Sequence, residues 1–94
     1  MNAITLPQAE EELELAFDYY QRQVSGLGLE LLDEYRRGVD RILEFPRAWH
    51  AVDDTFRRYR LRRFPYGIVY QISEAEDLII IVEFMHMSQL PRHW

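Results

Sequence analysis

The stretch that decides the fold is RRYRLRRFPYGIVYQISEAEDLIIIVEFMH, residues 57–86, because there the sequence pattern changes from a period of 3.6 residues to a period of two. A period of two is typical of β-strands, whose side chains point alternately to the two faces of a sheet. The pattern predicts a strand from residue 57, a turn at residues 65–67, a strand over 68–73 and a third strand over 78–86. Strands joined by such short turns pair in antiparallel fashion.

Upstream of this stretch, apolar residues recur at the spacing of two amphipathic helices. The first set is Ala9, Leu13, Ala16, Phe17, Tyr20 and Val24, and the second is Leu31, Leu32, Tyr35, Val39, Ile42 and Leu43. Pro7 suits the first turn of a helix, residues 25–28 break the pattern, and Pro46 ends the second helix. We expect the two helices to form an antiparallel hairpin and residues 2–6 to form a short strand.

These elements follow a β-α-α-β-β-β order. We therefore expect an α+β fold in which a helix hairpin packs on a small twisted antiparallel β-sheet. The 94 residues are expected to form one domain, 1–94, since the chain contains no linker, internal repeat or low-complexity segment.

The composition excludes several classes of protein. The chain has no cysteine, so neither a disulfide framework nor a cysteine metal site is available. No His-x-x-x-His motif or carboxylate cluster predicts a metal site, and no cofactor is expected. The longest apolar run, residues 78–82, is too short to span a membrane, and the N-terminus lacks a signal-peptide pattern, so we expect a cytoplasmic protein with no membrane partner.

Charge is unevenly distributed along the chain, whose net charge is −5. Residues 1–46 hold ten acidic residues and four arginines, whereas residues 47–94 hold six acidic residues and seven arginines. Lysine is absent. Direct nucleic-acid binding is not expected, because proteins that bind nucleic acids directly are usually basic.

The predicted strand that begins at residue 57 is cationic on one face. Arg58, Arg60, Arg62 and Phe64 should share that face, and Tyr59 and Leu61 should share the other. One interpretation is an exposed face whose charges prevent edge-to-edge aggregation. The other is an electrostatic footprint for an acidic partner. The pattern alone leaves both open.

The last predicted strand is apolar on both faces. One face carries Leu78, Ile80, Val82 and Phe84, and the other carries Ile79 and Ile81. A helix hairpin covers only one face of a sheet, and a strand that is buried on one face should alternate. We therefore expect Ile79 and Ile81 to lie open to a partner chain, with the tail, residues 87–94, as the alternative cover.

Five segments in this order give the chain a resemblance to a known family. They are AEEELELAFDYY (residues 9–20), GLGLELLDE (26–34), ILEFPRAW (42–49), RRYRLRRFPYGIVY (57–70), and a tail that keeps the spacing of His86, Pro91 and Trp94. Together they resemble the ParE branch of the RelE/ParE superfamily, the toxins of type II toxin–antitoxin modules. The resemblance implies two helices against a twisted antiparallel sheet, and a cognate ParD-like antitoxin that wraps the toxin with a C-terminal segment.

The tail departs from the family pattern. The family often has His-x-x-Arg-x-Pro with a second arginine beside the first, where this chain has Gln89 and Leu90. The chain stops at Trp94, where relatives often carry a polar or basic extension. Both changes remove positive charge from a region implicated in toxicity across the family. A toxin that has lost its potency but still binds the antitoxin is therefore one hypothesis.

The resemblance implies a binding inhibitor of DNA gyrase rather than an enzyme. The alternative is a ribosome-dependent mRNA endonuclease of the RelE type. In that case, His86 would serve as general acid and Arg60 or Arg62 would hold the phosphate.

The candidate binding residues come from the exposed aromatic, arginine and strand positions. For the antitoxin or the target they are Tyr19, Tyr20, Arg58, Arg60, Arg62, Ile79, Ile81, His86 and Trp94. We expect an amphipathic antitoxin helix followed by an extended piece, with acidic residues that meet some of Arg58, Arg60 and Arg62.

Overall fold

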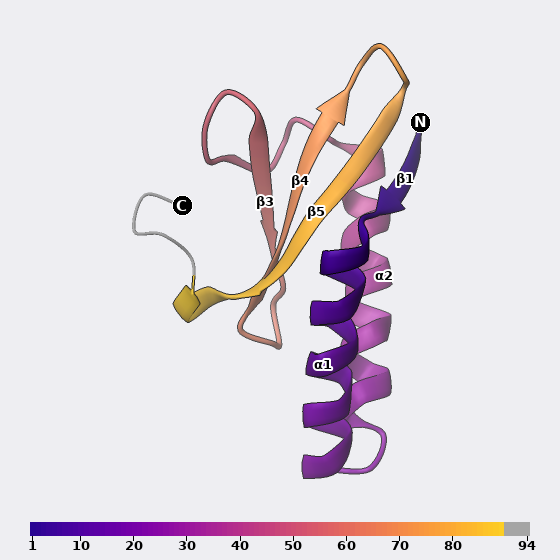
Figure 1. The fold of residues 1–94 in the computed structure, drawn as a ribbon, viewed down its shortest axis with the longest axis vertical. Coiled ribbons are helices and arrows are strands. Elements are labelled where there is room, and N and C mark those ends of the chain that lie inside the picture. Colours follow the sequence, from indigo (N-terminus) through magenta and orange to yellow (C-terminus); the bar gives the residue numbers. More distant parts are fainter. Residues whose placement is uncertain (90–94) are drawn as a thin grey trace.

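The computed structural model describes residues 1–89, and its elements follow the predicted order (Figure 1). They are β1 (Asn2–Thr5), α1 (Pro7–Gln23), α2 (Leu27–Glu44), β2 (His50–Ala51), β3 (Phe56–Arg60), β4 (Tyr66–Ser73), β5 (Leu78–His86) and a 3-10 turn, η1 (Met87–Gln89). The α+β fold class is confirmed, with one additional short strand, β2, inside a segment expected to be a loop.

The helix hairpin depends on two glycines. Gly26 has a φ of 90°, a left-handed conformation that glycine adopts without strain, and it separates the helices. At Gly28 a Cβ atom would lie 2.7 Å from the carbonyl oxygen of Phe17, so the close contact of α1 with α2 requires glycine there. Within residues 1–89, neither helix combines the length and the apolar character that crossing a membrane requires.

The sheet has five strands in the order β1-β5-β4-β3-β2. β3, β4 and β5 pair in antiparallel fashion, as expected from their short connections, and the additional strand β2 pairs with β3 in the same way. β1 pairs with β5 in parallel, so the complete sheet is mixed. A parallel pairing is possible here because the rest of the fold lies between these two strands along the chain.

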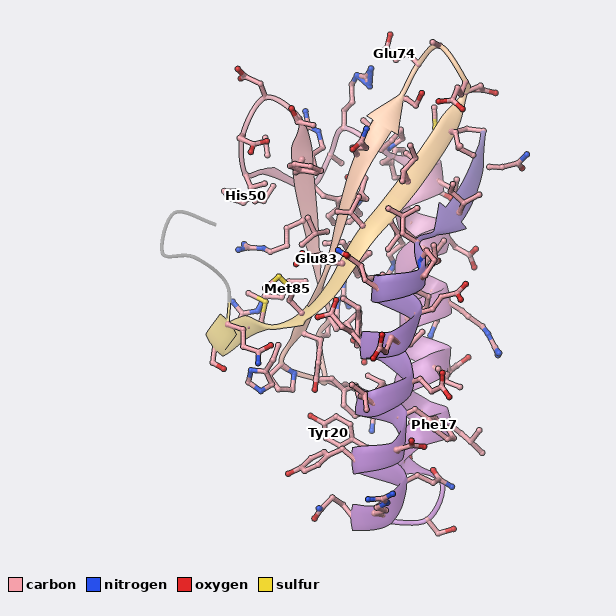
Figure 2. The ribbon with its side chains drawn as sticks, in the orientation of Figure 1. Phe17, Tyr20, His50, Glu74, Glu83 and Met85 are labelled. Carbon is pink, nitrogen blue, oxygen red and sulfur yellow. The ribbon has the colours of Figure 1, made fainter. Side chains whose placement is uncertain are left out.

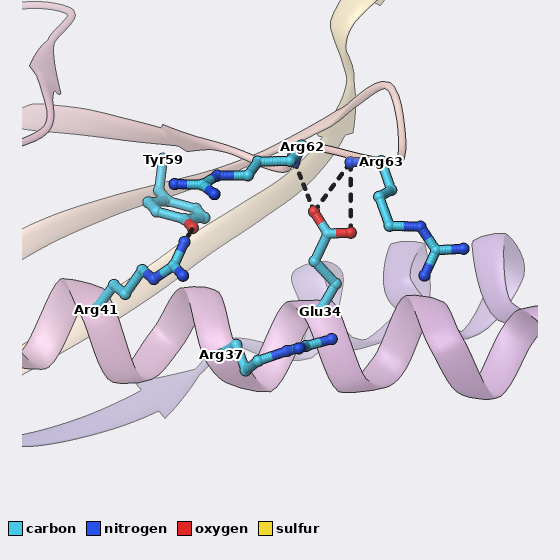
Figure 3. Close-up of a pocket in the computed structure, with 6 residues that line it drawn as sticks. All are labelled: Glu34, Arg37, Arg41, Tyr59, Arg62 and Arg63. Carbon is cyan, nitrogen blue, oxygen red and sulfur yellow. Dashed lines mark hydrogen bonds between the residues drawn. The ribbon is translucent and has the colours of Figure 1, made fainter.

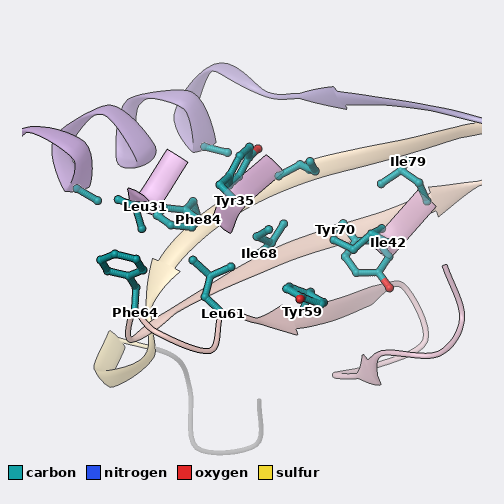
Figure 4. Packing of buried hydrophobic residues seen from close by; sticks show 13 residues of the cluster. Leu31, Tyr35, Ile42, Tyr59, Leu61, Phe64, Ile68, Tyr70, Ile79 and Phe84 are labelled. Carbon is teal, nitrogen blue, oxygen red and sulfur yellow. The ribbon is translucent and has the colours of Figure 1, made fainter. Parts of the chain in front are cut away.

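The core lies between the sheet and the helix hairpin, which packs on one face only (Figures 1 and 4). Its larger members are Leu31, Tyr35, Ile42, Tyr59, Leu61, Phe64, Ile68, Tyr70, Ile79, Ile81 and Phe84. The Tyr70 hydroxyl reaches across this layer and donates to the Pro46 carbonyl at 2.6 Å. This bond ties the end of α2 to the middle of the sheet.

The expectation that Ile79 and Ile81 lie open to a partner was wrong, because both side chains are fully buried in the core. The cause is a β-bulge: the register of β4 and β5 skips Val82. Since one extra residue reverses the alternation of side chains, Ile79 and Ile81 before it and Phe84 after it all face the helices.

The cationic stretch is also shorter as a strand than expected. β3 ends at Arg60, so Arg62 and Phe64 lie in the connection to β4 rather than on a continuous arginine face. Two backbone N–H groups of this connection donate to a carboxylate of α2 instead of to a neighbouring strand. Phe64 is consequently buried in the core together with Tyr59 and Leu61, although the pattern had placed it on the opposite face from those two residues.

The face of the sheet opposite the helices, hereafter the outer face, carries Arg58 and Arg60 of β3. Arg58 and Arg60 alternate with the buried Tyr59 and lie opposite Val69 and Gly67 of β4. Burial and the neighbouring charge of Arg60 lower the pKa of the Arg58 guanidinium. The outer face is therefore cationic along β3.

Candidate functional site

A groove runs between α1 and the C-terminal end of β5. Its lining residues are Glu12, Leu15, Ala16, Tyr19, Tyr66, Phe84, His86 and Gln89, and its volume is about 330 Å³. Because most of these side chains are apolar or aromatic, it is called the aromatic groove below. Two residues expected from the sequence, Tyr19 and His86, meet in it.

The α1 wall of the aromatic groove exposes two large side chains. Leu15 is 63% exposed and Tyr19 is 57% exposed, and they lie one helical turn apart. Large apolar groups on a helix normally face the core, so such a pair beside a groove is typical of a surface that binds a partner. Leu15 was not among the residues that the sequence predicted, although its position beside the apolar stripe of α1 could have indicated it.

The floor of the aromatic groove is a set of packed rings. Tyr66 stacks on Phe84, with ring centroids 4.7 Å apart and planes 5° apart, and His86 meets the edge of Tyr66 at 5.2 Å. Tyr20 is half-buried and meets Phe64 edge-to-face at 5.0 Å, beneath the β3–β4 connection. It projects from a different side of α1 than Phe17 does (Figure 2). Packed rings hold the floor in one shape, which suits it to receive an apolar anchor.

His86 is oriented by the residues that follow it. Its Nδ1 accepts a hydrogen bond from the backbone N–H of Ser88 at 3.1 Å and lies 2.8 Å from the Ser88 hydroxyl. In the neutral ring, Nδ1 is therefore the acceptor and Nε2 carries the proton. The contacts with Ser88 and Tyr66 give His86 a structural role at the end of the groove.

Glu12 places a carboxyl group on the rim of the aromatic groove. Burial and, to a smaller extent, the nearby charge of Glu83 raise the pKa of Glu12 above its ordinary value of 4.5. Glu83 in turn accepts a hydrogen bond from the Gln8 side chain at 3.4 Å. The N-terminal part of α1 therefore gives this side of the groove an acidic rim.

The structure does not bring His86 together with Arg60 or Arg62. His86 lies opposite Tyr66, whereas Arg60 lies opposite Gly67, the next residue along β4. Neighbouring residues of a strand point to opposite faces, so His86 is on the helix side and Arg60 on the outer face. Arg62 lines a different pocket, and no arginine of residues 1–89 lines the aromatic groove.

That second pocket, the guanidinium pocket, lies between α2 and the β3–β4 connection (Figure 3). Its lining residues are Glu34, Arg37, Arg41, Tyr59, Arg62 and Arg63, and its volume is about 150 Å³. Only Arg62 among these was predicted as a site residue. The pocket gathers four guanidinium groups around one buried carboxylate.

Glu34 builds the guanidinium pocket. Its side chain is 9% exposed, and its Oε2 accepts the backbone N–H groups of Arg62 at 2.5 Å and Arg63 at 3.2 Å. A buried carboxylate is tolerated where hydrogen bonds satisfy it, and this one fixes the bend after β3. The sequence could have indicated that Glu34 is buried, because this acid lies on the apolar stripe of α2, three residues after Leu31 and four before Gly38.

Two of the predicted positions cannot be placed, because Leu90 and Trp94 lie outside the described residues. Over residues 1–89, no group of three or more histidine, cysteine or acidic side chains is arranged to hold a metal ion.

Comparison with known proteins adds the family. A family model described as "ParE toxin of type II toxin-antitoxin system, parDE" matches residues 4–91. A solved structure described as "Chromosomal ParDE TA system from P. aeruginosa" is similar in fold, with a TM-score of 0.78 and 14% sequence identity, and the match covers 92% of this chain and 95% of that one. No curated protein matches the chain. Because the family model spans almost every described residue, including both pockets, the chain belongs to the ParE toxin family of type II toxin–antitoxin systems.

Proposed function

We propose that this toxin is held inactive by a cognate ParD-like antitoxin that docks in the aromatic groove, and that its target is DNA gyrase. The observation that carries the proposal is the family match over residues 4–91. The groove supports the antitoxin part, because it offers exposed apolar side chains on α1 beside a floor of packed rings.

The groove suits an amphipathic helix as its ligand. An apolar side chain of such a helix, seated between Leu15 and Tyr19, would cover surface that is now in contact with water. Full burial of one aliphatic side chain stabilises a complex by roughly 1.5–3 kcal/mol. Most of the affinity is therefore expected from apolar anchors.

The outer-face arginines support a second contribution. Arg58 and Arg60 lie on the face that the helices leave uncovered, where acidic residues of the antitoxin can approach them. A partly exposed ion pair contributes at most about 1 kcal/mol. These arginines would chiefly accelerate association and fix the orientation of the partner.

The choice of gyrase over translated mRNA as the target is supported by the family match and by the placement of the basic residues. An mRNA endonuclease would need His86 and an arginine at one phosphate, and the structure places His86 and Arg60 on opposite faces of the sheet. A binding inhibitor has no such requirement. The proposal places the toxin in the cytoplasm with its target.

The test is a supercoiling assay with purified toxin and gyrase, run with and without the antitoxin encoded beside it. We expect loss of supercoiling and accumulation of cleaved DNA, both reversed by equimolar antitoxin. Full gyrase activity in the presence of micromolar toxin, together with cleavage of translated mRNA in a primer-extension assay, would contradict the proposal. Normal growth of cells that express the toxin alone would contradict it as well.

A further inference from the structure

The guanidinium pocket contains two arginines whose charge is not balanced locally. Arg37 forms an ion pair with Asp33 at 2.8 Å, and Arg63 forms one with Glu30 at 2.7 Å. Neither Arg41 nor Arg62 has an ion pair with an acid anywhere in residues 1–89.

The buried carboxylate of the pocket does not supply the missing partner. Glu34 directs its oxygens to the backbone N–H groups of Arg62 and Arg63, and within residues 1–89 it accepts no hydrogen bond from a guanidinium group. Figure 3 shows these bonds beside the side chain of Arg41, which extends toward Tyr59. The concave surface therefore presents positive charge to solvent.

Tyr59 adds a third polar group at the same place. Its hydroxyl oxygen accepts a hydrogen bond from Nη1 of Arg41 at 2.9 Å, so its own proton remains available for donation. The ring is 5% exposed and meets Trp49 edge-to-face at 4.8 Å, which fixes the hydroxyl in position. In Figure 3, the side chains of Arg41 and Arg62 approach the Tyr59 ring from α2 and from the β3–β4 connection.

We propose that the guanidinium pocket binds one carboxylate, the side chain of an aspartate or glutamate on a protein partner. Arg41 and Arg62 would donate to it through their guanidinium groups, and Tyr59 through its hydroxyl. Planar guanidinium groups match the geometry of a carboxylate and form hydrogen bonds that are strengthened by charge.

Three observations favour a protein carboxylate over a nucleic-acid phosphate chain. The volume of about 150 Å³ accommodates a single small group. Glu30, Asp33 and Glu34 lie in or beside the pocket and would repel a polyanion that continued past it. The net charge of the chain, −5, opposes a long phosphate backbone in the same way. An isolated carboxylate carries one charge, fits the volume and meets this repulsion only at the pocket itself, where the guanidinium groups offset it.

This inference does not rest on the proposed function, since the two pockets share no lining residue. The toxin can bind its antitoxin in the aromatic groove whether or not the guanidinium pocket has a ligand. Conversely, an acidic segment of any partner protein can occupy the guanidinium pocket while gyrase is unaffected.

The test is an NMR titration that follows the side-chain Nε–H signals of the arginines. The probe is a capped hexapeptide with a single glutamate among serines, and the control probe is the same peptide with glutamine in place of the glutamate. We expect saturable shifts of the Arg41 and Arg62 signals with the glutamate peptide only. Loss of a hydrogen bond to a charged group weakens binding by about tenfold or more, so Arg62→Gln should reduce the affinity by that factor.

Two further variants keep the result independent of folding defects. Tyr59→Phe preserves the ring and should also lower the affinity for the glutamate peptide. Its thermal unfolding is recorded to confirm that the variant is folded. Arg36→Gln removes an exposed arginine of α2 that does not line the pocket, and it should leave the affinity unchanged. Equal losses in Arg36→Gln and Arg62→Gln would overturn the inference, as would tighter binding of a duplex oligonucleotide that shifts the same Arg41 and Arg62 signals.

Discussion

The aromatic groove and the guanidinium pocket lie on either side of the β3–β4 connection and are built on different principles. Tyr66, directly after this connection, belongs to the groove, whereas Arg62 and Arg63 within it belong to the pocket. The groove exposes apolar area, which supplies binding energy without strict geometry. The pocket presents fixed donors, which discriminate among ligands by charge and shape. One short connection therefore borders both pockets, the one proposed to supply affinity and the one proposed to supply selectivity.

The largest effect should come from removing the carboxylate that builds the guanidinium pocket. Glu34→Ala would leave the partly buried backbone N–H groups of Arg62 and Arg63 without their carboxylate acceptor, at a cost of about 3 kcal/mol in the free energy of unfolding. Urea unfolding monitored by circular dichroism measures it. The matched control is Asp33→Ala, which removes an exposed acid from the same helix and should cost less than about 0.5 kcal/mol. Equal losses in the two variants would show that the bend after β3 does not depend on Glu34.

A smaller effect, on binding rather than folding, should follow truncation of the groove wall. Leu15→Ala should weaken antitoxin binding by about 1.5 kcal/mol, or roughly tenfold, because an apolar anchor loses its contact. Leu29→Ala provides the control, since Leu29 is 59% exposed, close to the 63% of Leu15, but lies outside the groove. Isothermal titration calorimetry with the antitoxin distinguishes them. If Leu29→Ala weakened binding as much as Leu15→Ala, the partner would not be using the groove.

The outer-face arginines should affect the rate of association more than the affinity. A double variant, Arg58→Gln with Arg60→Gln, should slow antitoxin association at low ionic strength and lower the affinity by at most about 1 kcal/mol for each ion pair lost. Stopped-flow fluorescence over a series of salt concentrations measures this. An association rate that stays the same at low salt would assign these two arginines to another partner.

The smallest effect concerns the acidic rim of the groove. The pKa of Glu12 is raised in the folded protein because burial and Glu83 disfavour the ionised form. The folded state therefore binds the proton more tightly than the unfolded state, and stability falls as the pH rises from below 4.5 through the folded pKa. Glu12→Gln should slightly stabilise the protein at pH 7 and lose that advantage in acid. Thermal unfolding of both proteins across this pH range measures the difference. A Glu12→Gln variant that is less stable than the wild type at pH 7 would contradict the prediction.

The sequence predicted the fold well because periodicity encodes it. Both helices and the last strand were located almost to the residue, since apolar spacing and the breaks at Gly26 and Pro46 are local signals. The face of Ile79 and Ile81 was predicted wrongly, because the bulge at Val82 depends on pairing with β4, and no local pattern reports it.

The sites were predicted less completely, for the same physical reason. Tyr19 and His86 were found in the groove because exposed aromatic and terminal-strand positions are visible in the sequence. Arg62 was assigned to a strand face, whereas the structure bends the chain toward α2 through Glu34. The sequence shows that Glu34 lies on the buried stripe of α2, but it does not show which distant backbone N–H groups this acid binds. The guanidinium pocket could therefore be identified only from the structure.

The most direct test of the central claim uses the two matched leucines as reporters. Methyl NMR spectra of the toxin, recorded free and in complex with its antitoxin, follow Leu15 in the aromatic groove and Leu29 outside it. Docking in the groove predicts large shifts and intermolecular contacts at the Leu15 methyl groups, with Leu29 almost unchanged. A fully formed complex in which the Leu15 signals stay at their free positions would contradict the assignment of the groove as the antitoxin site.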